Sequence, residues 1–119
     1  MTAVDRVEQF LTDVESLDDP AVFISVAESA TLLAAANELD HRPADELPLR
    51  GLIFGVKDNI DVVGMPTTAG CPAFSFDPET SAPVVQRLVD AGALPVAKTN
   101  LDQFATGVVG TRSPYGIPR

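Results

Sequence analysis

The sequence contains little cysteine and little histidine, one of each among its 119 residues. A lone Cys71 cannot form an internal disulfide, and we expect it to be a small packed residue rather than a nucleophile. The lone His41 lies in a polar stretch, which argues against a Ser-His-Asp triad or a histidine-rich metal site. Chemistry centred on a thiolate, an imidazole or a disulfide scaffold is therefore not expected.

Basic residues are also scarce, with 8 Lys and Arg against 17 Asp and Glu and a formal net charge of −9. This balance argues against nonspecific binding to nucleic acid or to anionic membranes, because both depend on clustered Lys and Arg. No apolar run approaches the roughly 20 residues needed to span a bilayer, and the N-terminus lacks the basic and apolar regions of a secretory signal. We expect a cytoplasmic protein without a membrane partner.

What the sequence does have is a hydrophobic content of 45%, enough for one soluble domain or a piece of a larger one. Its first 46 residues predict a helical segment that ends in a linker. An amphipathic helix is expected from apolar residues at helical spacing, Val4, Val7, Phe10, Leu11 and Val14. A short extended piece over 21–26, a second helix over 29–39 and a polar linker over 41–48 should follow.

Residues 47–119 form the second predicted unit, and its pattern changes to strand, loop, helix, strand. The strands are expected over 52–56 and 93–97, with a helix over 81–90 between them. Pro83 suits the first turn of that helix, and Gly92 suits a left-handed C-terminal cap. The unit is a βαβ, whose strands should be parallel with a right-handed crossover. The predicted fold class is α/β: N-terminal helices, then this unit as part of a larger mixed sheet covered by helices.

Each of these two strands ends in a lysine followed by polar residues, at Lys57 and Lys98. Parallel strands expose their carboxyl ends at one edge of a sheet, which is where ligands bind in open α/β folds. Burial could lower the pKa of Lys57 enough for it to act as a general base. Alternatively, Lys57 extends to solvent or pairs with Asp58 or Asp61. For Lys98 we expect a structural ion pair or a cap contact.

Other catalytic motifs are missing. Ser113 does not lie in a Gly-x-Ser-x-Gly turn, and the sequence has no phosphate-binding loop of the Gly-x-x-x-x-Gly-Lys type. The spacing of Asp58, Asp61 and Asp102 matches no hard-cation loop, so these are expected to be solvated carboxylates. The sequence predicts neither a metal nor a cofactor.

Four segments together resemble the amidase signature family: residues 48–60, which contain Lys57, then 64–70, 81–92 and 96–104. They occur in the order and at the spacing of that family. Residues 102–116 are similar to its allophanate hydrolase branch, since other members usually carry Glu where this chain has Gln103. The resemblance therefore favours amide C–N hydrolysis in urea breakdown.

The resemblance implies that Lys57 is the catalytic lysine, which acts through a serine on a cis peptide to deprotonate a nucleophilic serine. It also implies that Thr106, Gly107 and Val108 border the substrate, a small-molecule amide. Both family serines lie beyond Arg119, so we expect this chain to be the opening part of a longer enzyme and inactive alone. Its expected partner is the remainder of the amidase domain or a second copy of itself.

Two other interpretations remain open at this point. The chain could belong to another amidase signature enzyme, such as an aryl or acyl amidase or the amidase subunit of glutamyl-tRNA amidotransferase. It could instead be a noncatalytic α/β module that uses the carboxyl edge of its strands to bind an acidic metabolite or a partner protein. Restored amide turnover with added C-terminal polypeptide would favour an enzyme, and ligand affinity of this chain alone would favour the module.

Overall fold

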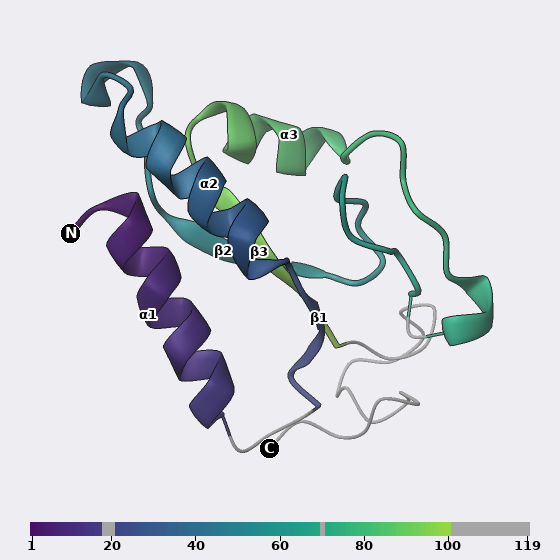
Figure 1. Cartoon of the computed structure of the whole chain (residues 1–119). Helices are drawn as coiled ribbons and strands as arrows, with labels where there is room; N and C mark the ends of the chain where they lie inside the picture. The colour runs from purple at the N-terminus through teal and green to yellow at the C-terminus, as the bar shows by residue number, and fades with distance from the viewer. Residues whose placement is uncertain (18–20, 70, 101–119) are drawn as a thin grey trace.

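The computed structural model describes residues 1–17, 21–69 and 71–100. Figure 1 shows the order of elements along this part of the chain. Three α-helices, three strands and two short 3-10 turns follow one another as α1 (Ala3–Ser16), β1 (Phe23–Val26), α2 (Ser29–Asp40), η1 (Ala44–Glu46), β2 (Ile53–Lys57), η2 (Pro72–Phe74), α3 (Pro83–Asp90) and β3 (Leu94–Thr99).

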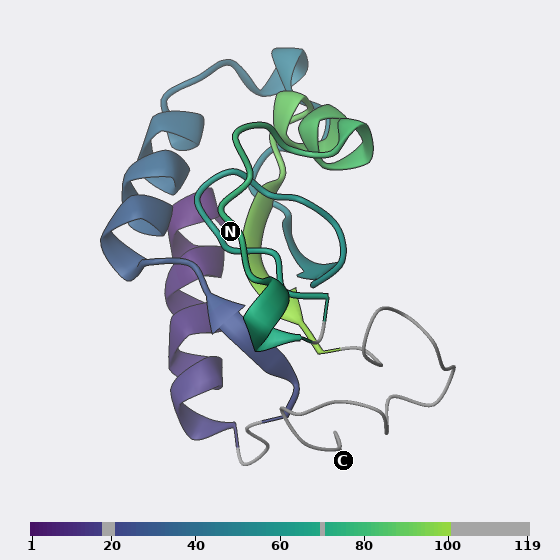
Figure 2. The ribbon, with the colours of Figure 1, turned by 90° about the vertical axis from the view of Figure 1, so that its right-hand side faces the viewer.

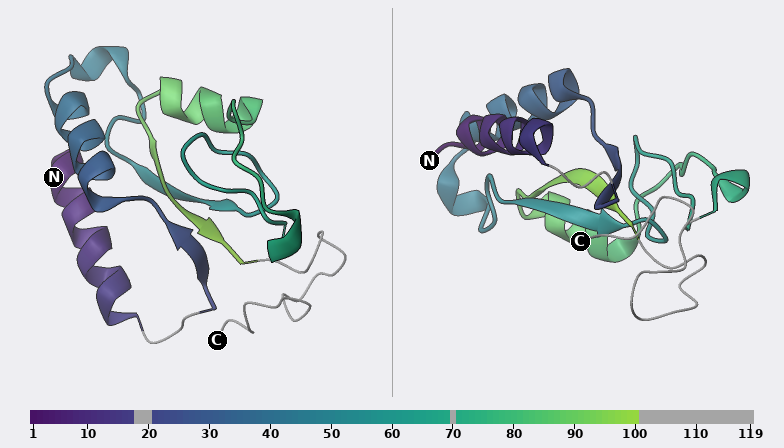
Figure 3. Two further views of the ribbon diagram at one scale, coloured as in Figure 1. Left: turned by 45° about the vertical axis from the view of Figure 1, so that its right-hand side comes forward. Right: turned by 90° about the horizontal axis from the view of Figure 1, so that it is seen from below.

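The strands form one mixed sheet in the order β1-β3-β2, with β3 in the centre. β1 runs antiparallel to β3, and β2 runs parallel to it. Helices α1 and α2 cover one face of the sheet, while α3 and the loop after β2 lie on the other (Figures 2 and 3). The predicted α/β class, with N-terminal helices and a parallel βαβ unit, is confirmed.

Helix α1 begins as its sequence predicts, with Thr2 as the N-cap. The Thr2 hydroxyl accepts the Asp5 N–H at 3.0 Å, and the Asp5 carboxylate accepts the Thr2 N–H at 3.1 Å, which makes a capping box. The carboxylate of Asp40, the last residue of α2, also accepts the N–H groups of Ala3 and Val4. This contact ties the end of one helix to the start of the other, and buried Val7 packs below it on the sheet.

Helix α3 starts at Pro83 and ends against Gly92, whose φ of +100° lies in the left-handed region. Both features were predicted from the sequence. Leu47 is buried, so the expected polar linker over 41–48 includes a core residue and the turn η1. The division into units 1–46 and 47–119 stays a prediction. In the described residues, no helix combines the length and apolar character that crossing a membrane requires.

The pairing of β2 with β3 contains a β-bulge that was not predicted from the sequence. Ile53 pairs with Leu94 and Phe54 with Pro95, but Gly55 then pairs with Ala97. Val96 is therefore an extra residue in β3, and every later position of that strand is shifted by one relative to β2. Because successive side chains of a strand alternate between faces, a shift of one residue moves all later side chains to the opposite face.

Candidate functional site

Lys57 is the last residue of β2, at the carboxyl edge of the sheet as its sequence predicts, and its side chain is exposed in this chain. Ile53 packs into the core under α1 and α2, so alternation along the regular strand β2 assigns Gly55 and Lys57 to that same face. Thr99 shares it, because a Cβ added to Gly55 would lie 3.0 Å from Thr99 Cγ2. The described residues offer no ion-pair partner to Lys57, so of the two alternatives to catalysis, extension to solvent is observed and pairing with Asp58 or Asp61 is not.

Lys98 reaches the same edge of the sheet but the opposite face. It pairs with Val56 rather than with Lys57 as a result of the bulge at Val96. Its side chain is 0% exposed, and its Nζ lies 3.3 Å from Asp58 Oδ1. The predicted structural ion pair of Lys98 is thus confirmed.

Asp58, by contrast, is not the solvated carboxylate that we expected, since it too is 0% exposed. Its Oδ2 accepts the backbone N–H of Thr68 at 3.2 Å and also a hydrogen bond from the Thr68 hydroxyl. Its Oδ1 has no hydrogen-bond donor of good geometry in the described residues, so its contact with Lys98 is chiefly Coulombic. An alternating strand pattern places Asp58 on the buried face with Val56, and this was the signal in the sequence that could have located it.

The loop after β2 returns over this buried pair, and Thr67 and Thr68 connect it to the pair by polar contacts. Lys98 Nζ lies 3.4 Å from Thr67 Oγ1 and 3.5 Å from the Pro66 carbonyl oxygen. Thr67 Oγ1 in turn donates to the Asp61 carboxylate at 2.8 Å. Asp61 is therefore used in an internal hydrogen bond, and the described residues contain no cluster of three or more His, Cys, Asp or Glu suited to a metal ion. Asp102, Thr106, Gly107 and Val108 lie outside the described residues.

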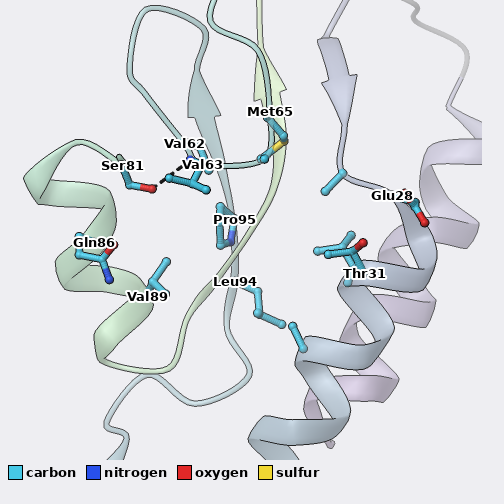
Figure 4. Close-up of a pocket in the computed structure, with 14 residues that line it drawn as sticks. Glu28, Thr31, Val62, Val63, Met65, Ser81, Gln86, Val89, Leu94 and Pro95 are labelled. Atoms are coloured by element: carbon cyan, nitrogen blue, oxygen red, sulfur yellow. Dashed lines mark hydrogen bonds between the residues drawn. The ribbon is translucent and has the colours of Figure 1, made fainter. Parts of the chain in front are cut away.

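One hollow in the described part of the chain lies away from Lys57. A groove of about 390 Å³ runs between α2 and α3 over the start of β3, where Leu94 and Pro95 line its floor (Figure 4). Those two residues pair with Ile53 and Phe54, at the end of β2 opposite to Lys57. The walls are mostly apolar, with a Val63 N–H donating to the Ser81 hydroxyl at 3.0 Å on one side. Lys57 does not line this groove, so the groove is separate from the candidate general base.

Comparison with known proteins gives concordant results. The family model described as Amidase matches residues 5–119. The chain is 53% identical over 100 residues to the urea amidolyase of Lachancea kluyveri, which covers 83% of this chain and 5% of that protein. It is 41% identical over 122 residues to the mandelamide hydrolase of Pseudomonas putida, covering 99% of this chain and 24% of that protein.

A solved structure supports the same assignment. The allophanate hydrolase of Kluyveromyces lactis superimposes with a TM-score of 0.83 at 43% identity, over 98% of this chain and 20% of that one. The chain thus spans a quarter or less of the length of these relatives. Family model, sequence identity and fold agree over almost the whole chain, which belongs to the amidase family.

Proposed function

We propose that this chain supplies the lysine base of an amidase that hydrolyses allophanate, with Lys57 as the base. The observation that carries the proposal is the position of Lys57 as the last residue of β2. A base at the carboxyl end of a strand lies where ligands meet an open α/β sheet. Lys98 forms an ion pair with Asp58, whereas Lys57 forms no ion pair with any described residue.

In the proposed mechanism the neutral amine of Lys57 accepts a proton from the bridging serine, which takes one from the nucleophilic serine. The serine oxygen then attacks the amide carbonyl, and backbone N–H groups stabilise the oxyanion. The proton passes to the departing nitrogen, ammonia leaves, and water hydrolyses the acyl-enzyme. Both serines belong to polypeptide that the family places after this segment, so the reaction belongs to the longer protein.

A lysine acts as a general base only in its neutral form, and burial in protein favours that form. The proposal therefore includes burial of Lys57 when further polypeptide covers its face of the sheet. Thr106, Gly107 and Val108 are proposed to border the acyl side of the substrate. The choice of allophanate is supported by the 53% identity to a urea amidolyase and by the fold of allophanate hydrolase.

A second candidate is hydrolysis of an aryl amide. It is favoured by the 41% identity to mandelamide hydrolase, which extends over 99% of this chain. The two candidates share Lys57 and differ only in the substrate, so one experiment can compare them.

The test is a chimera in which residues 1–119 replace the matching segment of Kluyveromyces lactis allophanate hydrolase, whose remainder is expected to supply the serines. Ammonia release is measured with allophanate and with mandelamide. Lys57→Ala should abolish turnover while the fold is retained, and Lys57→Arg should not restore it because guanidinium stays protonated. Arg87→Ala, which removes an exposed cation on α3, is the control and should keep activity.

Substantial turnover by folded Lys57→Ala would refute the role of Lys57. Preference for mandelamide over allophanate would select the second candidate. An inactive chimera, together with ligand binding by residues 1–119 alone, would favour a noncatalytic module.

A further inference from the structure

The pair of Asp58 and Lys98 is fully buried, which Asp and Lys side chains almost never are unless they are paired. Both side chains are 0% exposed, and the two charges lie 3.3 Å apart. Moving two charges out of water is costly, and a buried ion pair is often no more stabilising than well-packed apolar residues of similar size. Stability alone is therefore a poor reason for the pair, and its position suggests another.

Asp58 directly follows Lys57, and each of its polar groups is fixed. Its N–H donates to the Thr99 carbonyl at 3.1 Å, and its own carbonyl accepts the Ala69 N–H at 3.1 Å. Its carboxylate binds Thr68 through Oδ2 and Lys98 through Oδ1. The chain leaving β2 is thus held from the centre strand on one side and from the returning loop on the other.

The side-chain contacts of Asp58 lie on the face of the sheet opposite to Lys57, so they can fix its backbone without occupying the space around its amine. We propose that Asp58, Lys98 and Thr68 form a clamp that positions Lys57, and that Asp58 and Lys98 are positioning residues rather than catalytic ones. The inference rests on the proposed role of Lys57 as the base. Because a displacement of about 1 Å in a catalytic group can cost about a hundredfold in rate, a clamp at this point would affect kcat more than substrate binding.

The decisive variant exchanges the ion pair for apolar residues, Asp58→Val/Lys98→Met, in the chimera described above. An apolar replacement of a buried pair can retain stability, but it removes the directional hydrogen bonds to Thr68. The clamp predicts a native melting temperature, a kcat lower by about 10- to 100-fold and a KM changed less than about twofold. If the variant keeps both the melting temperature and the kcat of the unsubstituted chimera, the proposal is overturned. In that case the ion pair serves only stability, and apolar residues replace it fully.

A milder variant covers the case in which the apolar pair does not fold. Thr68→Val removes one hydroxyl donor to Asp58 Oδ2 and keeps the backbone donor. It should lower kcat several-fold with little change in KM. Thr80→Val, at an exposed position before α3, is the matched control and should leave both constants unchanged. Equal kcat values for these two variants would count against the clamp.

Hydrogen exchange on residues 1–119 alone separates failure of the clamp from failure of the proposed function. The amides of Asp58 and Ala69 should lose at least about tenfold protection in Thr68→Val or in the apolar pair, while Val7 on the opposite face keeps its own. Unchanged protection at Asp58 and Ala69 would overturn the clamp whatever the enzyme assays give. An active Lys57→Ala chimera would refute the proposed function, and the exchange data would still decide whether the pair holds this strand end.

Discussion

Gly92→Ala tests whether the turn between α3 and β3 is packed too tightly against Arg50 and Leu47 to accept a side chain. Gly92 has φ +100°, and a Cβ there would lie 2.8 Å from Arg50 Cα and 3.0 Å from Leu47 Cβ. The left-handed conformation costs an L-residue about 1–2 kcal/mol. Forcing an extra carbon against packed backbone adds about 1–3 kcal/mol. The substitution should therefore lower the free energy of unfolding by about 2–5 kcal/mol.

Gly64→Ala provides the matched control, because Gly64 has φ +92° but nothing lies within 4 Å of the added Cβ. It should carry the conformational cost alone, about 1–2 kcal/mol. Urea unfolding followed by far-UV circular dichroism gives both values, provided that the slope with denaturant is the same in the two variants. Equal destabilisation by the two substitutions would refute the reasoning, since it would mean that the contact with the Arg50 backbone costs nothing.

Three further predictions concern the isolated chain. The Thr2 backbone N–H, and then its side chain, hold the pKa of Asp5 below its ordinary value, so this cap should be fully present above the usual carboxyl range and lost as pH falls through the lowered pKa. The protection factors of amides at the start of α1, taken relative to the intrinsic exchange rate at each pH, should fall at acid pH in the native chain and show no such step in Asp5→Asn. Residues 1–119 alone should release no ammonia from allophanate, because a lysine without its serines cannot form an acyl-enzyme. The same chain should associate or bind hydrophobic dyes, since β2 has no neighbour on its outer edge in the described sheet and Leu52, Phe76 and Val84 are exposed. Ammonia release would contradict the second prediction, and a compact monomer that binds no dye would contradict the third.

Local chemistry made much of this fold predictable from the sequence. Helical spacing located α1, Pro83 marked the start of α3, and Gly92 marked its end. The parallel pairing of β2 and β3 followed from the order of elements and the crossover preference. In each case the determining residues are close together in sequence, so a pattern within a few residues was sufficient.

Long-range pairing was not predictable in the same way. β1 was expected only as an extended piece, and its antiparallel pairing with β3 joins Ser25 to Lys98 across more than half the chain. The buried partnership of Lys98 with Asp58 depends on the register of two strands and on a returning loop. Alternation along β2 could have placed Asp58 on the face of buried Val56, but no local pattern determines the strand register or the path of the loop, so the pairing of Asp58 with Lys98 was not predictable.

The bulge at Val96 explains why two similar strand ends behave differently. Without the extra residue, continuation of the Phe54 to Pro95 register would place Lys98 opposite Lys57 on one face. Two ammonium groups would then be neighbours about 5 Å apart at their Cβ atoms, an arrangement that destabilises a sheet. With the bulge, the Lys98 side chain lies on the opposite face and forms an ion pair with Asp58. Lys57 stays on the face of Ile53, where its amine is exposed and is proposed to act as the base. The lysine and polar residues that end each strand look equivalent in the sequence, and a single residue of register decides which lysine is buried in an ion pair and which remains available for chemistry.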